Sequence, residues 1–326
     1  MIPERGLPPH VTLPAGSLQY HLSHLPPPEE PLSPLTPLAP TLSSITAGQS
    51  NRDTRIMSIF NVTPDSFSDG GKHFGLDEDQ MSRTVQSHIA AGATIIDLGG
   101  QSTRPGAIQV SPQEEIARVL PAVKLIRSIP ESKNVAISVD TYRADVAQAT
   151  IAAGADIVND VSAGLLDDDM LPTMAKLGCT VCLMHMRGTP ETMTELTGYP
   201  DGVVETVGRE LAERVRQAER AGIRRWRIIL DPGIGFAKNQ AQNLELLRRL
   251  GDLKQYPGLQ GLPWLVGTSR KAFIGRITGV EQAGQRTWGT AAAVTAAIHG
   301  GADIVRVHDV KEMSQVAKMA DAVWRV

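Results

Sequence analysis

The sequence has few cysteines and no long apolar run, and its charges nearly balance. Only Cys179 and Cys182 are cysteines, which excludes a disulfide scaffold. No stretch approaches the roughly 20 apolar residues of a membrane span. The N-terminus shows no basic region followed by an apolar core, so no secretory signal is visible. The formal net charge of −3 lacks the basic excess of nucleic-acid-binding and membrane-surface proteins. We therefore expect no nucleic-acid or membrane partner and a cytoplasmic location, with a mitochondrial one left open.

The two cysteines have the CxxC spacing that redox and metal sites use. The run 180–186, however, is typical of a buried strand, and residues three apart on a strand point to opposite faces. We therefore predict two small apolar core residues rather than a redox or metal pair.

Several catalytic motifs are also absent. The sequence contains no Walker A motif, no HExxH and no Ser/His/Asp set with a nucleophile elbow. It has no GxGxxG turn after its first predicted strand, which disfavours an open dinucleotide-binding sheet. The chemistry is therefore not expected to begin with attack by a nucleophilic side chain.

Residues 1–51 differ in composition from the rest of the chain. Half of the 22 prolines lie there, with serine, threonine and leucine between them. Proline removes backbone donors and fixes φ, so this stretch should be extended or irregular. Its leucines and Tyr20 would let it pack in part on the remainder. We predict a Pro-rich linker or extension over 1–51 and one domain over 52–326.

From residue 54 short apolar strands alternate with segments of helical period. The predicted strands are 55–62, 93–99, 135–141, 156–161, 180–186, 228–232, 264–269 and 304–310. The clearest predicted helices are 114–129, 142–153, 203–221, 243–250, 288–299 and 311–324. Glycines stand where helices should end, at Gly92, Gly154, Gly178, Gly222 and Gly301. Eight such repeats predict an α/β fold of the (β/α)₈, or TIM, barrel type with an irregular N-terminal extension.

The ends of these strands carry most of the chemically useful side chains. In a (β/α)₈ barrel the chemistry lies at the C-terminal ends of the strands. The alternation along each strand allows one set to face the barrel mouth together: Asp97, Asp140, Asn159, Met184, Asp231, Lys271, Arg306 and His308. One acid at a strand end is often only a helix cap. Several converging on one mouth indicate a binding site.

Two chemistries can be distinguished in this set. Asp140, Asn159, Asp231 and Lys271 combine acceptors, an amide and a cation, which suits the edge of a planar heterocycle rich in N–H donors and ring nitrogens. The second group consists of Asn61, Arg104, Arg306 and His308, donors and cations that suit a diphosphate. Asn61 also opens a polar, glycine-containing loop, 61–71, typical of a segment that closes over a polar ligand.

Seven segments spread over residues 54–326 resemble dihydropteroate synthase. They are NVTPDSFSDGG (61–71), GGQSTRPGA (99–107), SVDT (138–141), NDV (159–161), DPGIGF (231–236), GTSRK (267–271) and RVHD (306–309). The resemblance implies a transferase of folate biosynthesis, a family of sulfonamide targets. It would join 6-hydroxymethyl-7,8-dihydropterin diphosphate to p-aminobenzoate by dissociative loss of diphosphate and attack of the arylamine.

The resemblance also implies roles for individual residues. Asp140, Asn159, Asp231 and Lys271 would hold the pterin, with Met184 and Phe236 lining its slot. Asn61, Arg104, Arg306 and His308 would hold the diphosphate, with Mg²⁺ on Asn61. The p-aminobenzoate pocket would consist of Phe67, Thr103 and Pro105. The catalytic set would be Asp97, Arg104, Lys271, Arg306 and His308.

Two further expectations come from the family. We expect a homodimer formed through the helices at 288–299 and 311–324. The Pro-rich head is similar to the linker that joins this domain to preceding pterin-pathway domains in fungal folate enzymes, which implies a possible upstream fusion. Two positions depart from some family members: Gln101 stands in place of glutamate, and Ala272 in place of a serine that contacts the p-aminobenzoate carboxylate.

Three rival functions remain open at this point. A related pterin-binding barrel transfers a methyl group from a methylated folate to a cobalt cofactor, but would not need the STRP loop or the diphosphate residues. A catalytically silent pterin-binding subunit would keep the same binding motifs. Architecture alone would also allow a phosphate-binding barrel enzyme such as an aldolase, which leaves the carboxylates and the amide unexplained.

Overall fold

The computed structural model describes residues 33–43, 45, 52–63, 77–101 and 109–325. It contains one parallel sheet in the strand order β6-β5-β4-β3-β2-β1-β8-β7. The strands are β1 (Arg55–Asn61), β2 (Ile95–Gly99), β3 (Ala136–Asp140), β4 (Ile157–Asp160), β5 (Thr180–Met184), β6 (Ile228–Asp231), β7 (Leu265–Val266) and β8 (Ile304–Val307). A parallel bridge between Leu230 and Trp264 joins β6 to the start of β7. The predicted eight-stranded barrel is therefore confirmed.

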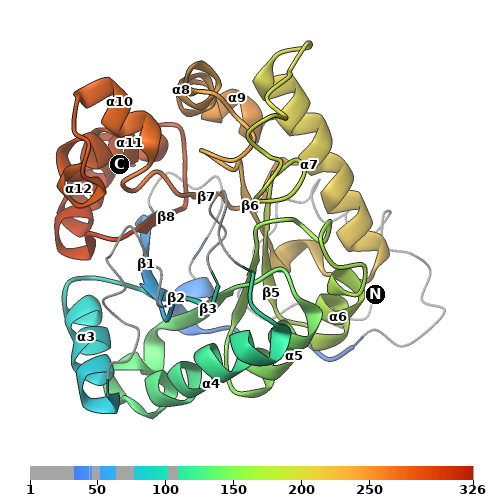
Figure 1. The fold of residues 1–326 in the computed structure, drawn as a ribbon, viewed down its shortest axis with the longest axis vertical. Coiled ribbons are helices and arrows are strands. Elements are labelled where there is room, and N and C mark those ends of the chain that lie inside the picture. Colours follow the sequence, from blue (N-terminus) through green and yellow to red (C-terminus); the bar gives the residue numbers. More distant parts are fainter. Residues whose placement is uncertain (1–32, 44, 46–51, 64–76, 102–108, 326) are drawn as a thin grey trace, which may run out of the picture.

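Helices surround the strands, as Figure 1 shows. They are α2 (Pro40–Ser43), α3 (Glu78–Ala90), α4 (Pro112–Ser128), α5 (Ala144–Ala152), α6 (Met170–Leu177), α7 (Val203–Arg220), α8 (Gln240–Arg248), α9 (Leu250–Lys254), α10 (Ala272–Thr278), α11 (Thr287–His299) and α12 (Val310–Trp324). All six predicted helices are present, with ends that shift by up to three residues. Among the described residues, no helix is both long and apolar enough to cross a bilayer.

Local sequence signals explain several of these boundaries. Ser111 caps α4 by accepting a hydrogen bond from the Glu114 N–H, with proline at the first helical position. All five predicted glycine stops have positive φ, between 61° and 109°. The prediction for β7 was too long, because the chain leaves the sheet after Val266 and turns through Arg270, whose φ is 60°.

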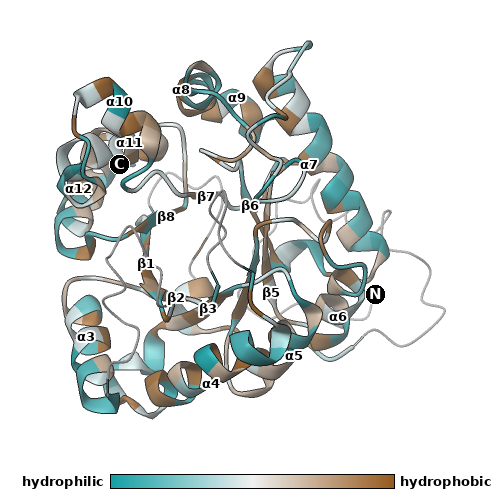
Figure 2. Ribbon diagram, in the orientation of Figure 1, coloured by the Kyte–Doolittle hydropathy of each residue, from teal (hydrophilic) through white to brown (hydrophobic). Residues whose placement is uncertain are grey.

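The core has two parts, one outside and one inside the barrel. The larger part lies between the strands and the helices. The smaller part fills the barrel with one residue from each strand: Met57, Ile95, Ala136, Ile157, Cys182, Ile229, Leu265 and Ile304. Figure 2 shows the corresponding hydropathy, brown along β1 and β5 and teal along much of α7.

The two cysteines fall on opposite sides of this division. Cys179 belongs to the outer core and Cys182 to the inner one, and both are free and buried. Burial raises the pKa of the Cys179 thiol to about 12 and that of Cys182 well above its usual value. The prediction of two inert core residues is confirmed.

Part of the Pro-rich extension closes the N-terminal end of the barrel. Leu42 of α2 is buried against the inner apolar layer. The Thr36 N–H donates to the Gly178 carbonyl at 3.0 Å, and Arg227 donates to the Thr36 carbonyl. The expectation that this segment is irregular is wrong at α2. One helical turn there buries the Leu42 side chain against the inner apolar layer, which is more favourable than leaving it in water.

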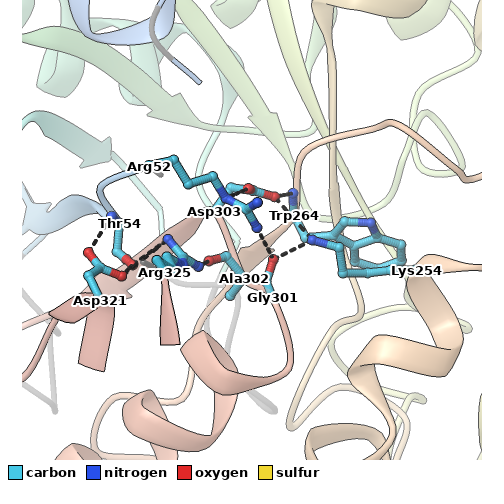
Figure 3. A network of polar contacts seen from close by, with 9 residues as sticks. All are labelled: Arg52, Thr54, Lys254, Trp264, Gly301, Ala302, Asp303, Asp321 and Arg325. Atoms are coloured by element: carbon cyan, nitrogen blue, oxygen red, sulfur yellow. Dashed lines mark hydrogen bonds and ion pairs between the residues drawn. The ribbon is translucent and has the colours of Figure 1, made fainter. Parts of the chain in front are cut away.

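A network of charged groups joins the segment that enters β1 to the last helix, α12, and to the start of β8 (Figure 3). Asp303, 1% exposed in its side chain, pairs with Arg52 at 2.9 Å and Lys254 at 3.5 Å, and accepts from the Trp264 N–H at 2.8 Å. Beside it, Asp321 of α12 accepts hydrogen bonds from the Thr54 N–H and hydroxyl, both at 2.7 Å. The chain entering β1 is thus fixed to β7, β8 and the last helix.

We expect Asp303→Ala to lower the free energy of unfolding by about 3–5 kcal/mol, because two half-buried cations lose their carboxylate and the buried backbone N–H of Trp264 loses its acceptor. Urea unfolding followed by circular dichroism measures this. Asp201→Ala is the matched control, since the Asp201–Arg209 pair is about half exposed, and its effect should stay below about 1 kcal/mol. Equal effects for the two variants would contradict the role of the network.

Candidate active site

The barrel mouth is built by the same alternation that fills the barrel below it. Two residues beyond the inner apolar layer, side chains again point inward. These positions hold Asp97, Asn159, Met184, Asp231 and Arg306. Two residues further along, β1 and β3 place Asn61 and Asp140. Most strands therefore change from an apolar to a polar inward residue within two positions.

Arg306 lies between two buried carboxylates. Its Nε donates to Asp97 Oδ2 at 2.6 Å and its Nη2 donates to Asp140 Oδ2 at 2.9 Å. Asn159 Nδ2 lies 3.3 and 3.4 Å from the two Asp97 oxygens. These four predicted site residues are thus brought together, with Arg306 engaged by carboxylates. Its Nη1 makes no hydrogen bond with the described part of the chain, which leaves the two N–H donors of that nitrogen for a ligand.

Asp140 retains acceptor capacity after this pairing. Its Oδ1 is buried and has no hydrogen-bond partner among the described residues. Burial raises the pKa of Asp140, while the Arg306 guanidinium opposes that rise. A buried acceptor left without a donor is costly, so this oxygen is suited to a donor supplied by a ligand.

Asp231 and Lys271 form a second polar pair across the mouth. Asp231 Oδ1 accepts from the Gly233 N–H at 2.7 Å, and burial raises the pKa of the carboxyl against the field of Lys271. Lys271 donates to the Ile234 carbonyl, and its Nζ lies 4.9 Å from the centroid of the Phe236 ring. Burial lowers the pKa of Lys271 to about 8. The loop after β6 thus carries a carboxylate and an aromatic ring next to a cation.

Met184 belongs to an apolar cluster at the same end of the barrel. The cluster contains Tyr142, Val161, Met184, Met186, Met193 and Ala237, with Leu166 and Phe236 packed against it. Unbranched methionine side chains adapt to flat or irregular ligands. An apolar wall therefore stands beside the polar pair, as a planar heterocycle requires.

His308 is placed by Ser269 rather than by Arg306. The Ser269 hydroxyl accepts from the His308 N–H at 3.2 Å and lies 3.0 Å from its Nδ1. Next to them, Arg270 and Asp309 form an ion pair at 2.5 Å. His308 and Arg306 thus follow each other on β8 and its exit but have different protein partners.

Asn61 offers an oxygen ligand at the end of β1. Its Oδ1 lies where a side chain on Gly99 would stand, 2.8 Å from the position of a Cβ there. Within the described residues no cluster of three or more His, Cys, Asp or Glu side chains could hold a metal. A single hard oxygen still fits Mg²⁺, which keeps several waters and is held by few protein ligands plus substrate phosphates.

Four predicted site residues, Phe67, Thr103, Arg104 and Pro105, lie outside the described residues. Sequence reasoning also missed a group behind the loop after β6, in which Lys238 contacts His185 and His185 contacts Glu210. His185 lies at the end of the predicted strand 180–186, which was a usable signal. Lys238 and Glu210 had none, because a lysine in a loop and a glutamate on a helix are usually exposed.

The sequence matches the family of pterin binding enzymes over residues 57–308. A folic acid synthesis protein, fol1, of Pneumocystis carinii is 50% identical over 273 residues, which are 83% of this chain and 36% of that protein. A dihydropteroate synthase of Synechocystis is 46% identical over 83% of this chain and 91% of its own length. The crystal structure of Yersinia pestis dihydropteroate synthase with a sulfonamide drug complex superposes with a TM-score of 0.76 at 41% identity, over 83% of this chain and 94% of that one.

The chain thus spans about a third of the fungal relative and nearly all of the cyanobacterial one. The matched region contains all eight strands except the first two residues of β1. Fold, sequence and extent of the match agree, and the chain belongs to the pterin-binding enzyme family.

Proposed function

We propose that this chain acts as a dihydropteroate synthase, joining 6-hydroxymethyl-7,8-dihydropterin diphosphate to p-aminobenzoate. The observation that carries the proposal is the unpartnered, buried Asp140 oxygen in a mouth that also holds Asp231 and Lys271. Such a mouth offers acceptors and a cation to a flat, nitrogen-rich ring. The names of the Synechocystis relative and the Yersinia structure support the same reaction.

The pterin is read by carboxylates on two sides of the mouth. Asp231 accepts from the guanidine-like edge of the ring, where parallel N–H groups favour a carboxylate. Asp140 and Asn159 serve the remaining ring donors and acceptors, and Lys271 donates to a ring acceptor. Met184 and Phe236 cover the faces of the ring. Asp140, Asn159, Met184 and Asp231 are buried, and Phe236 and Lys271 are half-buried.

The diphosphate is held by donors that the pterin does not use. Arg306 contributes the Nη1 left open by its two carboxylate bonds, and His308 adds a donor fixed through Ser269. By the family resemblance Arg104 completes this group. Asn61 would hold Mg²⁺ together with diphosphate oxygens; the ion, when bound, would neutralise charge on the leaving group.

The reaction breaks one C–O bond and forms one C–N bond. As the bond from the exocyclic CH₂ to diphosphate breaks, Arg306 and His308 stabilise the departing negative charge. Asp97 and Asp140 place negative charge near the pterin, where positive charge develops. The p-aminobenzoate amine then bonds to the CH₂ carbon and releases one N–H proton to solvent. This amine is neutral and nucleophilic at pH 7, so no strong protein base is needed.

The p-aminobenzoate pocket is assigned to Phe67, Thr103 and Pro105 by resemblance. Ala272 begins α10 directly after Lys271 and is exposed. It carries no hydroxyl for the substrate carboxylate, so that contact would have to come from backbone N–H groups.

Assembly and domain limits complete the proposal. Residues 52–326 form the catalytic domain and 1–51 an extension, of which residues 33–43 and 45 belong physically to the barrel end. The share covered of the fungal relative supports fusion to upstream pterin-pathway domains. A homodimer would use α11 and α12, where Trp288, Met319 and Val323 are 86%, 66% and 49% exposed.

The reaction is tested by mixing the purified chain with the dihydropterin diphosphate, p-aminobenzoate and Mg²⁺ and separating dihydropteroate by chromatography. Omission of each component provides the controls. Pterin binding without product would favour a silent pterin-binding subunit instead.

We expect Asp231→Asn to weaken binding of 6-hydroxymethylpterin by about 10- to 100-fold, because a charged acceptor for two N–H groups becomes a neutral amide with one acceptor. Isothermal calorimetry measures the affinity. Asp201→Asn changes an exposed carboxylate and should leave the affinity unaltered. Wild-type affinity in Asp231→Asn would rule out the assigned role.

The acid limit of pterin binding should move to higher pH in Arg306→Met. Burial and Asp97 raise the pKa of Asp140, and Arg306 opposes them, so removing the guanidinium raises that pKa further. An ionised Asp140 exists only above its pKa, and affinity is therefore lost as pH falls through it. Calorimetry with 6-hydroxymethylpterin, which lacks the diphosphate, isolates this effect. Arg216→Met, which removes an exposed cation, is the control, and an unmoved limit in Arg306→Met would refute the coupling.

The double variant Trp288→Glu/Met319→Glu should be monomeric, because charges on both helices would be buried at the interface. Light scattering after gel filtration measures the mass. Leu165→Glu alters a similarly exposed apolar residue away from these helices and should remain dimeric. A monomeric wild-type chain, or a dimeric double variant, would disprove this interface.

A further inference from the structure

The loop between β6 and α8 forms one wall of the candidate site and is held in an unusual shape. Three of its residues have positive φ: Gly233 at 68°, Gly235 at 85° and Ala237 at 48°. L-residues with a side chain rarely adopt such values, and Ala237 is one of them. Surrounding contacts must therefore hold the loop, because the backbone alone would relax to other conformations.

Lys238 supplies the central contact by folding back beneath its own loop. Its Nζ donates to the Phe236 carbonyl at 2.9 Å and the Gly233 carbonyl at 3.1 Å, and lies 2.9 Å from His185 Nδ1. The residue is buried. An ammonium group has three N–H donors, and here each has an acceptor. The carbonyls of Gly233 and Phe236, at the two ends of the turn, thus accept hydrogen bonds from the same nitrogen.

His185 connects Lys238 to helix α7 through hydrogen bonds at its two ring nitrogens. Its Nε2 lies 2.8 Å from Glu210 Oε2, so the ring donates from Nε2 and accepts at Nδ1. Burial and the nearby Lys238 lower the pKa of His185 to about 4, which keeps the ring neutral. Glu210 of α7 is itself held by Arg187 at 3.0 Å. The loop is therefore anchored to β5 and α7 through side chains.

A second lysine contacts the same loop from the site side. Lys271 donates to the Ile234 carbonyl, whereas the carbonyls at Gly233 and Phe236 point to Lys238. There is little room for adjustment behind the loop, because a Cβ on Gly233 would lie 2.0 Å from the His185 carbonyl oxygen and 3.2 Å from Lys238 Nζ. Movement of this turn would displace the groups in front of it.

Lys238 is unsuited to direct contact with a substrate. It is enclosed by the turn, and its three donors are used. The charged or titratable groups that face it are His185, Glu210, Arg187, Asp231 and Lys271. Of these, Asp231 and Lys271 also belong to the candidate site. The lysine thus lies directly behind the residues proposed to read the pterin.

We propose that Lys238 is a positioning residue for pterin binding, which acts by fixing the turn that places Asp231, Phe236 and Lys271. The inference rests on the proposed function, and it identifies a residue outside the site as a determinant of pterin affinity. It assigns no direct pterin contact to Lys238.

The test compares Lys238→Met with Lys254→Met in the full chain. Lys238 is buried and Lys254 half-buried, and both donate to backbone carbonyls, but Lys254 does so at the opposite end of the barrel, to Gly301. Lys238→Met should weaken 6-hydroxymethylpterin binding in calorimetry by about tenfold or more, because two buried carbonyls lose their donor and the turn relaxes. The KM for p-aminobenzoate should change little. Lys254→Met should lower stability and leave pterin affinity intact.

Hydrogen exchange locates the effect without relying on activity. Amides of the 233–237 turn should exchange faster in Lys238→Met and stay protected in Lys254→Met. His185→Leu should reproduce the loss of affinity, and His185→Gln, which keeps an acceptor and a donor, should recover part of it. The double variant Lys238→Met/His185→Leu should be no weaker than Lys238→Met, because both changes break one connection. If Lys238→Met does not fold, the His185 pair supplies the same comparison.

The outcomes separate the two proposals. Wild-type pterin affinity and turn protection in a folded Lys238→Met variant would overturn the positioning role while leaving the proposed function intact. A wild-type chain that neither binds pterin nor forms dihydropteroate would overturn the proposed function, and the pterin role of Lys238 with it.

Discussion

The mouth of this barrel depends on Arg306. Asp97 and Asp140 are buried beside each other, and two carboxylates removed from water repel one another and lose hydration. One guanidinium that donates to both offsets part of that cost and fixes their relative position. The carboxylates remain available because Arg306 satisfies only one oxygen of Asp140. Because one oxygen of Asp140 is left without a partner, the mouth can accept a hydrogen bond from a donor-rich ring.

The two ends of the barrel use charge for different purposes. At the N-terminal end Asp303 has partners on several elements, and Leu42 closes the barrel interior. At the C-terminal end Asp140 keeps an oxygen without a partner. Both oxygens of Asp303 lie close to a cation, although its Oδ1 accepts no hydrogen bond among the described residues. The free oxygen of Asp140 faces the mouth instead, where a ligand donor can recover the free energy that its burial costs. Stability and recognition are therefore separated along the barrel axis.

The sequence predicted the barrel and most of the mouth for a physical reason. Alternation along a strand is fixed by the backbone, so one apolar inner layer determines which later residues face inward. Asp97, Asn159, Asp231 and Arg306 followed from that rule. The pairing of Arg306 with carboxylates did not follow, because the family assignment placed it with the diphosphate and only three-dimensional distances show its neighbours. The α2 turn was missed because prolines dominate its segment, and β7 was overestimated because its end is set by tertiary contacts.

Lys238 illustrates the limit of sequence reasoning more clearly. Nothing local distinguishes a lysine that is buried from one that is solvated, since its burial results from the positive φ values around it and from His185, 53 residues away in the chain. A buried ammonium is acceptable only when every donor is satisfied. The turn that satisfies those donors also carries Phe236, and its Gly233 N–H donates to Asp231. The same turn conformation therefore satisfies the buried Lys238 ammonium and shapes the wall of the candidate site. A change in the conformation of this turn would affect both.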